Sequence, residues 1–299
     1  MKLYKALLPL LMVLIMASCV KSPDLSKEQK ESEGKYYTEF TSMIPEAKNP
    51  KELFSYIDQH AGDIPRDDFT KIIIAQINYQ DSFLKTFEEN YFSQSVQEIL
   101  YNVLGNDTSK IENGALDIEN KEVADLVKAT YEYGYRIDMS EGMYFPILDY
   151  GVYKKYKEYL NEDALEFIEI LSAESDKVPL KDAALVIPYE EVLNRAIRCE
   201  SFLKKYPGFE GEKFISDLFE KYQAITFYGS NNTPLFDYGT KEMNEKAKEA
   251  YQSFVKSIGN ENSEFKKNLR LFLEVLAKNG YKLTGEVDDF RDIKAPIKY

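Results

Sequence analysis

The sequence predicts an all-α domain of stacked helical hairpins with one or two irregular loops. Apolar residues recur at spacings of three and four along most of the chain, which is the pattern of helices with one buried face. Several of these segments begin at helix-capping sequences, such as Asn49-Pro50. No long stretch alternates polar and apolar residues, as a half-buried strand does. These three observations favour helices over strands throughout the domain.

Start signals divide the first half of the domain into separate helices. Asn49 and Asn120 are typical N-cap residues, because their side chains can accept hydrogen bonds from N–H groups of the first turn. Pro65 precedes an arginine and two aspartates and opens a long helix. Asn113-Gly114 is a turn pair and predicts a short hairpin over residues 111–118. The helices expected from these signals span residues 36–44, 49–57, 65–87, 93–104 and 121–133.

Similar signals divide the second half. Asn161 is a candidate N-cap, Pro188 opens a helix, and Gly280 closes the last one. A short apolar run lies at residues 183–187, and the tail over residues 281–299 shows no helical pattern and is expected to be irregular. The helices expected here span residues 152–160, 161–171, 188–206, 211–227, 241–258 and 263–278.

Composition narrows the classes of partner and cofactor. The 299-residue chain has a net charge of −13. This charge argues against nucleic acid as a partner, because phosphate binding needs a basic surface, and against adhesion of the folded surface to anionic lipids. The chain has one histidine, His60, and no phosphate-binding loop, zinc spacing or calcium-loop pattern, so we predict no cofactor and no metal.

The first 19 residues have the order of regions found in an export signal. Lys2 and Lys5 precede an apolar run from Ala6 to Met16 that is too short for a comfortable membrane span, and two small residues then lead to Cys19. This segment resembles the lipobox signal peptide of bacterial lipoproteins, although Met16 stands where that family usually has leucine. The alternative is an ordinary secretory signal with an incidental cysteine.

The resemblance implies cleavage before Cys19 and a diacylglycerol on its sulfur. Residues 1–18 would be the signal peptide, the polar residues 19–33 a tether, and residues 34–299 a domain on the extracytoplasmic face of the cell membrane. The membrane is then a partner through the lipid on Cys19. Cys199 would have no intrachain partner, and the helical stripe passing close to it indicates a buried, unreactive thiol.

Two stretches of the chain repeat one another. Residues 146–151 read Pro-Ile-Leu-Asp-Tyr-Gly, and residues 234–239 read Pro-Leu-Phe-Asp-Tyr-Gly. Each follows a Tyr-Gly pair and lies between two predicted helices. We call residues 133–151 the first joint and residues 228–239 the second joint. An internal duplication and chance repetition in a chain with 23 tyrosines both explain the match.

The two joints gather polar and aromatic side chains that could bind a ligand. If both joints lie at one end of the stacked helices, these side chains converge on a pocket that would suit a sugar, a peptide or an amine. The alternative is structural: the aspartates accept backbone N–H groups, the tyrosines fill the interface, the asparagines form turns, and the arginine pairs with a carboxylate of its own joint. The candidate residues are Arg136, Asp138, Glu141, Tyr144, Asp149 and Tyr150 in the first joint and Tyr228, Asn231, Asn232, Asp237 and Tyr238 in the second.

These observations favour a lipid-anchored extracytoplasmic protein of the bacterial cell envelope that binds a small polar ligand or an envelope protein and is not an enzyme. The alternative is an envelope hydrolase acting on peptidoglycan or peptide, with Asp138 or Glu141 as its acid or base. A structural spacer without a ligand is the third hypothesis. No nucleophile beside a base and no set pair of carboxylates is evident, so we assign no catalytic residue.

Overall fold

The structure is a computed structural model that describes residues 34–111, 114–257, 259 and 262–296. The predicted signal peptide, Cys19 and the predicted tether lie outside these residues. The described chain is mostly helical, which confirms the predicted all-α fold class. Its α-helices are α2 (Lys35–Met43), α3 (Pro50–His60), α4 (Arg66–Phe87), α5 (Gln94–Leu104), α6 (Lys121–Glu132), α7 (Glu162–Asp176), α8 (Tyr189–Lys205), α9 (Glu212–Tyr228), α10 (Glu245–Lys256), α11 (Glu264–Lys278) and α12 (Gly285–Lys294).

Antiparallel β-hairpins and short 3-10 helices connect these helices. The hairpin of the first joint is the longest and pairs Tyr135 with Leu148 at its base. The strands are β1 (Tyr135–Ser140), β2 (Met143–Leu148), β3 (Leu180–Lys181), β4 (Ala184–Leu185), β5 (Gly229–Ser230) and β6 (Thr233–Pro234). The 3-10 helices are η1 (Ile44–Glu46), η2 (Glu88–Tyr91), η3 (Thr108–Lys110) and η4 (Tyr150–Tyr159).

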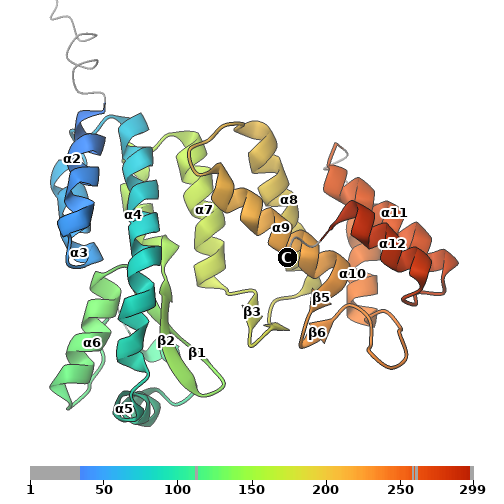
Figure 1. Cartoon of the computed structure of the whole chain (residues 1–299), viewed down its shortest axis with the longest axis horizontal. Helices are drawn as coiled ribbons and strands as arrows, with labels where there is room; N and C mark the ends of the chain where they lie inside the picture. Colours follow the sequence, from blue (N-terminus) through green and yellow to red (C-terminus); the bar gives the residue numbers. More distant parts are fainter. Residues whose placement is uncertain (1–33, 112–113, 258, 260–261, 297–299) are drawn as a thin grey trace, which may run out of the picture.

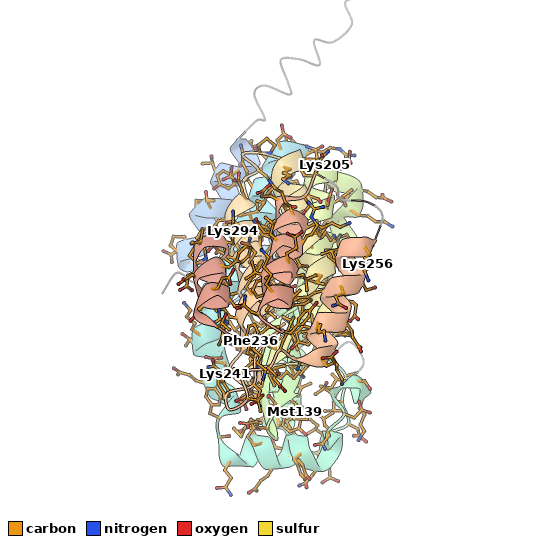
Figure 2. All side chains as sticks on the ribbon, turned by 90° about the vertical axis from the view of Figure 1, so that its right-hand side faces the viewer. Met139, Lys205, Phe236, Lys241, Lys256 and Lys294 are labelled. Atoms are coloured by element: carbon orange, nitrogen blue, oxygen red, sulfur yellow. The ribbon has the colours of Figure 1, made fainter. Side chains whose placement is uncertain are left out.

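The helices lie side by side in a row that broadly follows the order of the chain, with α2 near one end and α11 and α12 at the other (Figure 1). α2 begins at the edge drawn uppermost, whereas the three hairpins and α5 lie along the opposite edge. The view turned by 90° keeps this separation, with Lys205 of α8 near the top and Met139 of β1 near the bottom (Figure 2). The molecule therefore has two distinct edges, and the three β-hairpins all lie along one of them.

Two groups of buried apolar side chains hold the row together. The larger group runs from α2 to α12, and the smaller one fills the space between the end of α4, α5, α6 and β1–β2. The 22-residue helix α4 serves both, because Phe69 near its start belongs to the larger group and Phe87 at its end belongs to the smaller. Each large apolar side chain that is fully buried stabilises the fold by about 1.5–3 kcal/mol. Helix α4 thus fixes the first joint against the rest of the domain.

The structure corrects the expectation of an irregular loop over residues 135–145, because residues 135–148 form a hairpin. They form β1 and β2, and buried Tyr135 and Ile137 alternate along β1 with half-buried Arg136 and Asp138. A strand is the conformation that places such alternating residues on opposite faces. The tight turn at its tip uses Glu141 and a glycine, both with positive φ.

Two further local predictions are wrong, and one cannot be followed. Residues 152–160 were expected to form an α-helix, but the structure has the 3-10 helix η4 over residues 150–159. The tail, expected to be irregular, contains α12, in which Thr284 caps the first turn and Val287 is buried. The hairpin expected around Asn113 lies partly outside the described residues, and residues 114–118 form no named strand.

Candidate functional site at the hairpin edge

The repeated motif has the same local geometry in both joints. Gly134 and Gly229 follow the ends of their helices with φ of 75° and 82°, values that favour glycine. After each hairpin, Asp149 and Asp237 use Oδ1 to accept the N–H of the glycine two residues later, at 2.9 Å in both cases. These are Asx turns. The predicted role of both aspartates as acceptors of backbone N–H groups is confirmed.

A third hairpin, β3–β4, stands between the two joints and bonds to both of them. On one side, Lys181 donates to Asp138 Oδ1 at 2.6 Å. On the other side, the backbone N–H of Asn232 donates to the carbonyl of Ala183 at 3.0 Å. The joints therefore lie on one edge, the condition for a shared pocket, but the middle hairpin separates them. The cavity that Arg136 and Asp138 line contains no residue of the second joint.

That cavity, of about 240 Å³, lies between the first joint and the middle hairpin. Residues 175–178, at the end of α7, and Lys181 complete its wall. The guanidinium of Arg136 donates to the carbonyl of Ser175 at 3.1 Å and lies 3.8 Å from the carboxylate of Asp176. Arg136 pairs with Asp176 and Asp138 pairs with Lys181, so the alternative pairing of Arg136 with Asp138 or Glu141 is wrong. Both charged residues of the first joint in this cavity, Arg136 and Asp138, therefore already have partners within the protein.

Tyr144 and Tyr150 of the first joint are structural. The fully buried Tyr144 donates its hydroxyl to the carbonyl of Gly105. Its backbone N–H and C=O both bond to the side-chain amide of Gln97, at 2.8 and 2.9 Å. Burial raises the pKa of Tyr150 to about 12 and also raises the pKa of the half-buried Asp149. These residues support the hairpin, which leaves Glu141 exposed at its tip.

Most of the second joint's candidate residues face outward. Tyr238 is 67% exposed and donates its hydroxyl to the carbonyl of Asn231 at 3.0 Å. Asp237 is exposed, and the N–H groups of Thr240 and of the glycine before it lower the pKa of its carboxyl. Tyr228 is instead half-buried. Its hydroxyl donates to Asp292 at 2.9 Å, and the guanidinium of Arg291 in α12 lies over its ring. The second joint therefore offers a polar surface with one large exposed ring.

Exposed apolar side chains mark the same edge, and the sequence analysis did not single them out. The described residues include six large apolar side chains that are exposed. We define the hairpin edge as the three hairpins, α5 and the segments directly before or after them (Figure 1). Tyr101 lies on α5 and Met143 on β2, whereas Phe92, Val186 and Tyr238 lie in the segments next to α5, β4 and β6. The sixth exposed side chain, Ile293, belongs to α12.

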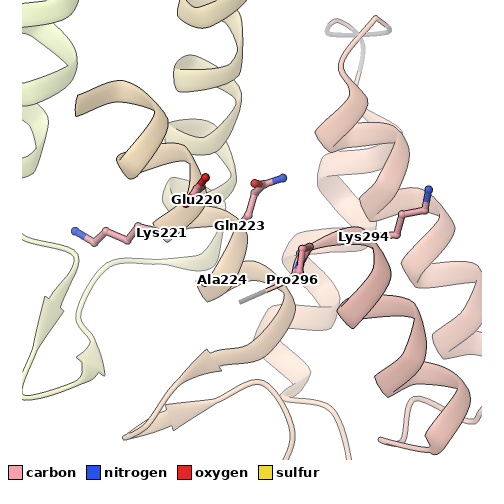
Figure 3. A pocket seen from close by; sticks show the side chains of 7 residues that line it. Glu220, Lys221, Gln223, Ala224, Lys294 and Pro296 are labelled. Carbon is pink, nitrogen blue, oxygen red and sulfur yellow. The ribbon is translucent and has the colours of Figure 1, made fainter. Parts of the chain in front are cut away.

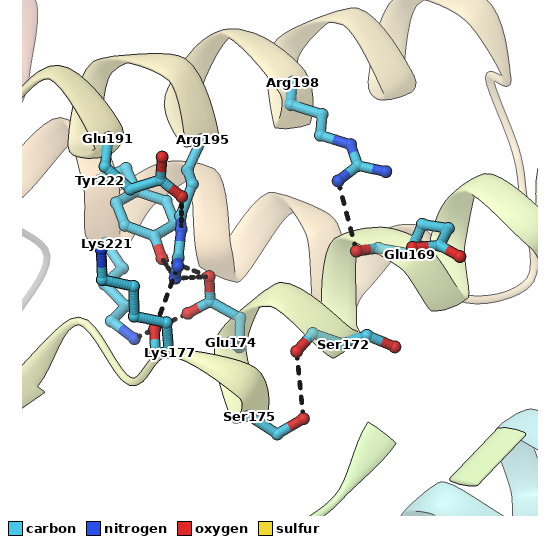
Figure 4. A network of polar contacts seen from close by, with 10 residues as sticks. All are labelled: Glu169, Ser172, Glu174, Ser175, Lys177, Glu191, Arg195, Arg198, Lys221 and Tyr222. Carbon is cyan, nitrogen blue, oxygen red and sulfur yellow. Dashed lines mark hydrogen bonds and ion pairs between the residues drawn. The ribbon is translucent and has the colours of Figure 1, made fainter. Parts of the chain in front are cut away.

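A buried polar network between α7, α8 and α9 is the strongest competing site (Figure 4). Arg195 donates to Glu191 at 2.9 Å, to Glu174 at 3.0 Å and to the carbonyl of Lys177 at 3.0 Å. The hydroxyl of Tyr222 donates to Glu174 as well. Because the charges are paired and bonded within the protein, this network is a tie between helices, and breaking one buried partner would cost about 3–5 kcal/mol.

Cys199 beside this network is buried, as predicted, with 1% exposure. Burial raises the pKa of its thiol to about 12, so the nucleophilic thiolate is scarce at neutral pH. No histidine lies on α8, and the sole histidine, His60, is in α3. A thiol in this setting is a small packing residue and not a nucleophile.

Other features of the described residues define no reaction centre. A cavity of about 330 Å³ lies between α9 and the end of α12, with Glu220, Lys221 and Lys294 on its walls (Figure 3). In the described part of the chain, no cluster of three or more histidine, cysteine or acidic side chains could hold a metal ion. None of the helices described there is long and apolar enough to cross a membrane.

The comparisons with known proteins add no family to these observations. No family model, no curated protein and no solved structure matches the chain. The function must therefore be argued from the residues and their arrangement.

Proposed function

We propose that the chain is a lipid-anchored extracytoplasmic protein of the bacterial cell envelope that binds a partner protein through its hairpin edge and catalyses no reaction. One observation carries the proposal: five of the six large apolar side chains exposed in the described residues lie on that edge. Exposed apolar groups with a polar surround are typical of protein contact sites. Polar groups of the hairpins, such as Asn231 and Glu141, supply that surround.

The direction of the edge supports the same proposal. The lipobox resemblance implies a lipid on Cys19, and residues 19–33 would lead from it to α2. Helix α2 begins at the edge opposite the hairpins (Figure 1). A domain held by this tether would turn its hairpin edge away from the membrane, where a partner can approach it. The alternative hydrolase has less support, because Asp138 is bonded to Lys181 and Glu141 stands alone at a hairpin tip.

Site-specific photo-crosslinking in intact cells tests the proposal. A photoreactive residue at Tyr238 or Met143 should give a discrete adduct with an envelope protein, and the same residue at Ile293 should not. Ile293 is the matched control because it is 75% exposed but lies on α12. Equal adducts from all three positions, or none, would contradict a partner site on the hairpin edge.

The anchoring is tested separately. Cys19→Ala should abolish partitioning of the chain into the detergent phase, while a Cys199→Ala variant, which alters a buried thiol, should partition like the parent. If Cys19→Ala partitions normally, the lipid anchor is refuted and the hairpin edge loses its defined orientation.

A further inference from the structure

One cavity differs from the others in the sign of its charges. A cavity of about 320 Å³ lies between the end of α10 and the start of α11. Among the described residues that line it, every charged side chain is cationic, although the chain has a net charge of −13. The cavities at α9–α12, at the Arg195 network, at the first joint and beside α6 each contain both acids and bases. The cationic cavity is lined by Lys256, Lys266, Lys267 and Arg270, with Ser257 and Ser263.

The described residues neutralise few of the cations of this cavity. Lys256 and Arg270 have no ion pair and no side-chain hydrogen bond with any described residue. Lys267 lies 3.6 Å from Glu264, in a pair whose side chains are more than half exposed. Pairs of this kind contribute about 0–1 kcal/mol. The cluster therefore keeps most of its positive charge.

Lys266 is fixed within the cavity. Its ammonium donates to the carbonyls of Ser257 at 2.6 Å and Gly259 at 2.7 Å. The backbone N–H groups at the start of α11 are already bonded, since Glu200 accepts those of Glu264 and Phe265 at 2.9 and 3.1 Å. An added anion would therefore be bound by the side chains around Lys266 and not by the helix end.

We propose that this cavity binds a phosphate group. Its volume lies at the lower end of the range of roughly 300–1,000 Å³ seen for small-molecule sites. Lysine and arginine donate to phosphate oxygens, and the serine hydroxyls of the wall can donate as well. The phosphate could belong to the headgroup of an anionic lipid or to a soluble phosphate compound. The overall acidity of the chain does not oppose this, because charges beyond roughly 8–10 Å are screened at physiological salt.

The position of the cavity determines whether a lipid headgroup could reach it. The end of α10 and the start of α11 lie in the half of the molecule in which α2 begins, away from the hairpins (Figure 1). Figure 2 likewise places Lys256 above Phe236 and Lys241. If the chain is anchored as proposed above, headgroup binding here would hold the far end of the helical row to the membrane. Phosphate binding itself does not depend on the anchor or on the hairpin edge.

Calorimetry with three soluble probes tests the site on the detergent-solubilised full chain. The probes are inorganic phosphate, glycerophosphoglycerol as an anionic headgroup, and glycerophosphocholine as a zwitterionic one. The double variant Lys256→Gln, Arg270→Gln should bind the anionic probes about tenfold more weakly, since charged hydrogen bonds are lost. The control Lys246→Gln, Lys278→Gln removes the same charge from the other ends of the same helices and should bind like the parent.

The outcomes separate the sources and can refute the site. Preference for glycerophosphoglycerol supports a lipid headgroup, and preference for inorganic phosphate supports a soluble compound; both support the site. Equal losses in the two double variants, or no heat with either anionic probe, would overturn it. Photo-crosslinking from Tyr238 reports on the hairpin edge alone, so failure of one proposal is distinguishable from failure of the other.

Discussion

The first joint carries strands of six residues, β1 and β2, whereas the second carries strands of two residues, β5 and β6. Both begin at a glycine of positive φ and end at an aspartate that forms an Asx turn. The longer hairpin buries Tyr135 and Tyr144 in its own apolar core between α4, α5 and α6. The shorter one has no such core and lies against the middle hairpin, where Leu185 donates to Thr233 at 3.0 Å.

This difference in strand length indicates that the repeated motif specifies where a hairpin begins and ends but not how long its strands are. The Tyr-Gly pair starts the turn out of the helix. The Asp-Tyr-Gly triplet closes each hairpin with an Asx turn, which leads directly into η4 in the first joint and into a turn before α10 in the second. The residues between them are free to vary with the packing available. The shared geometry fits an internal duplication with an extended first copy. The following predictions test how far the two joints are equivalent.

Substitution of the helix-ending glycines should produce the largest effects. A Cβ at Gly229 would lie 2.3 Å from the backbone nitrogen of Leu235, which cannot move without opening the hairpin. Gly229→Ala should therefore lower the free energy of unfolding by about 3–5 kcal/mol, through a clash added to positive-φ strain. A Cβ at Gly134 meets the side chains of Gln80 and Phe54, at 2.5 and 2.9 Å, which can shift. Gly134→Ala should cost less, about 2–3 kcal/mol.

The control for this series is Gly142→Ala, at a hairpin tip with φ of 78° and no atom within 4 Å of the added Cβ. It isolates backbone strain and should cost about 1 kcal/mol. Urea unfolding of the three variants gives the order. If Gly134→Ala is as damaging as Gly229→Ala, the two helix ends are equally constrained, and the contrast between the joints is not one of rigidity.

The contacts of each joint with the middle hairpin should differ in salt dependence. Asp138→Asn weakens the ion pair with Lys181, whose side chains are 16% and 32% exposed, and should cost about 1 kcal/mol. Asn232→Ala removes exposed side-chain bonds to Asp182 but keeps the backbone bond to Ala183, and should cost less than about 0.5 kcal/mol. High salt should reduce the first cost and leave the second unchanged. Thermal unfolding at two salt concentrations measures both.

The same Asp138 variant separates structure from ligand binding. A lower melting temperature with no effect of added sugars, muropeptides or amines is the result expected from the bond to Lys181. A variant as stable as the parent that loses a ligand-induced shift would show instead that the carboxylate serves a ligand.

The two repeated aspartates should give small and opposite pH effects. Burial raises the pKa of Asp149, so its contribution to stability is present at low pH and is lost as pH rises through its folded pKa. Backbone N–H groups lower the pKa of Asp237, so its contribution is present above the unfolded pKa and is lost as pH falls through the folded one. Asparagine can still accept the N–H bonds at both positions.

At about pH 7, Asp149→Asn should therefore raise the melting temperature slightly and Asp237→Asn should lower it. The first difference should shrink as the pH falls toward about 4, and the second as the pH falls below about 4. Differential scanning calorimetry across this range provides the measurement. Differences of the same sign in the two variants would mean that the repeated motif has the same electrostatic setting in both joints.

The helices were predictable because their signals are local. Asn49 and Asn120 accept backbone N–H groups at 3.3 and 3.1 Å, as capping residues should. Asn161 occupies the N-cap of α7 as expected, but its side chain donates to Asp67 of another helix at 2.9 Å, a tertiary contact that sequence spacing cannot show. The hairpin β1–β2 did carry a signal, since apolar Tyr135, Ile137 and Met139 alternate with polar residues, but the run is short.

The site was predictable only in part, because residue type does not determine exposure. Tyr144 and Tyr238 were both candidates, yet one is fully buried in a core and the other is 67% exposed. The sequence analysis left open whether both joints lie at one end of the fold. It did not foresee the middle hairpin, whose strands have two residues each and follow no strong pattern. The exposed Met143 and Val186 stand out only once the tertiary arrangement defines an edge.

The side-chain amide of Gln97 affects whether copies of this chain could pair through the edge of β2. An outer strand of a small sheet is a template onto which another chain can add a strand. Gln97 bonds to both peptide groups that Tyr144 would offer on β2. On β1, Lys181 and Asp138 take the carbonyl and the N–H of Met139. At Tyr144 and Met139, the outer backbone groups of this hairpin are therefore already bonded within the protein, which disfavours the addition of a further strand there.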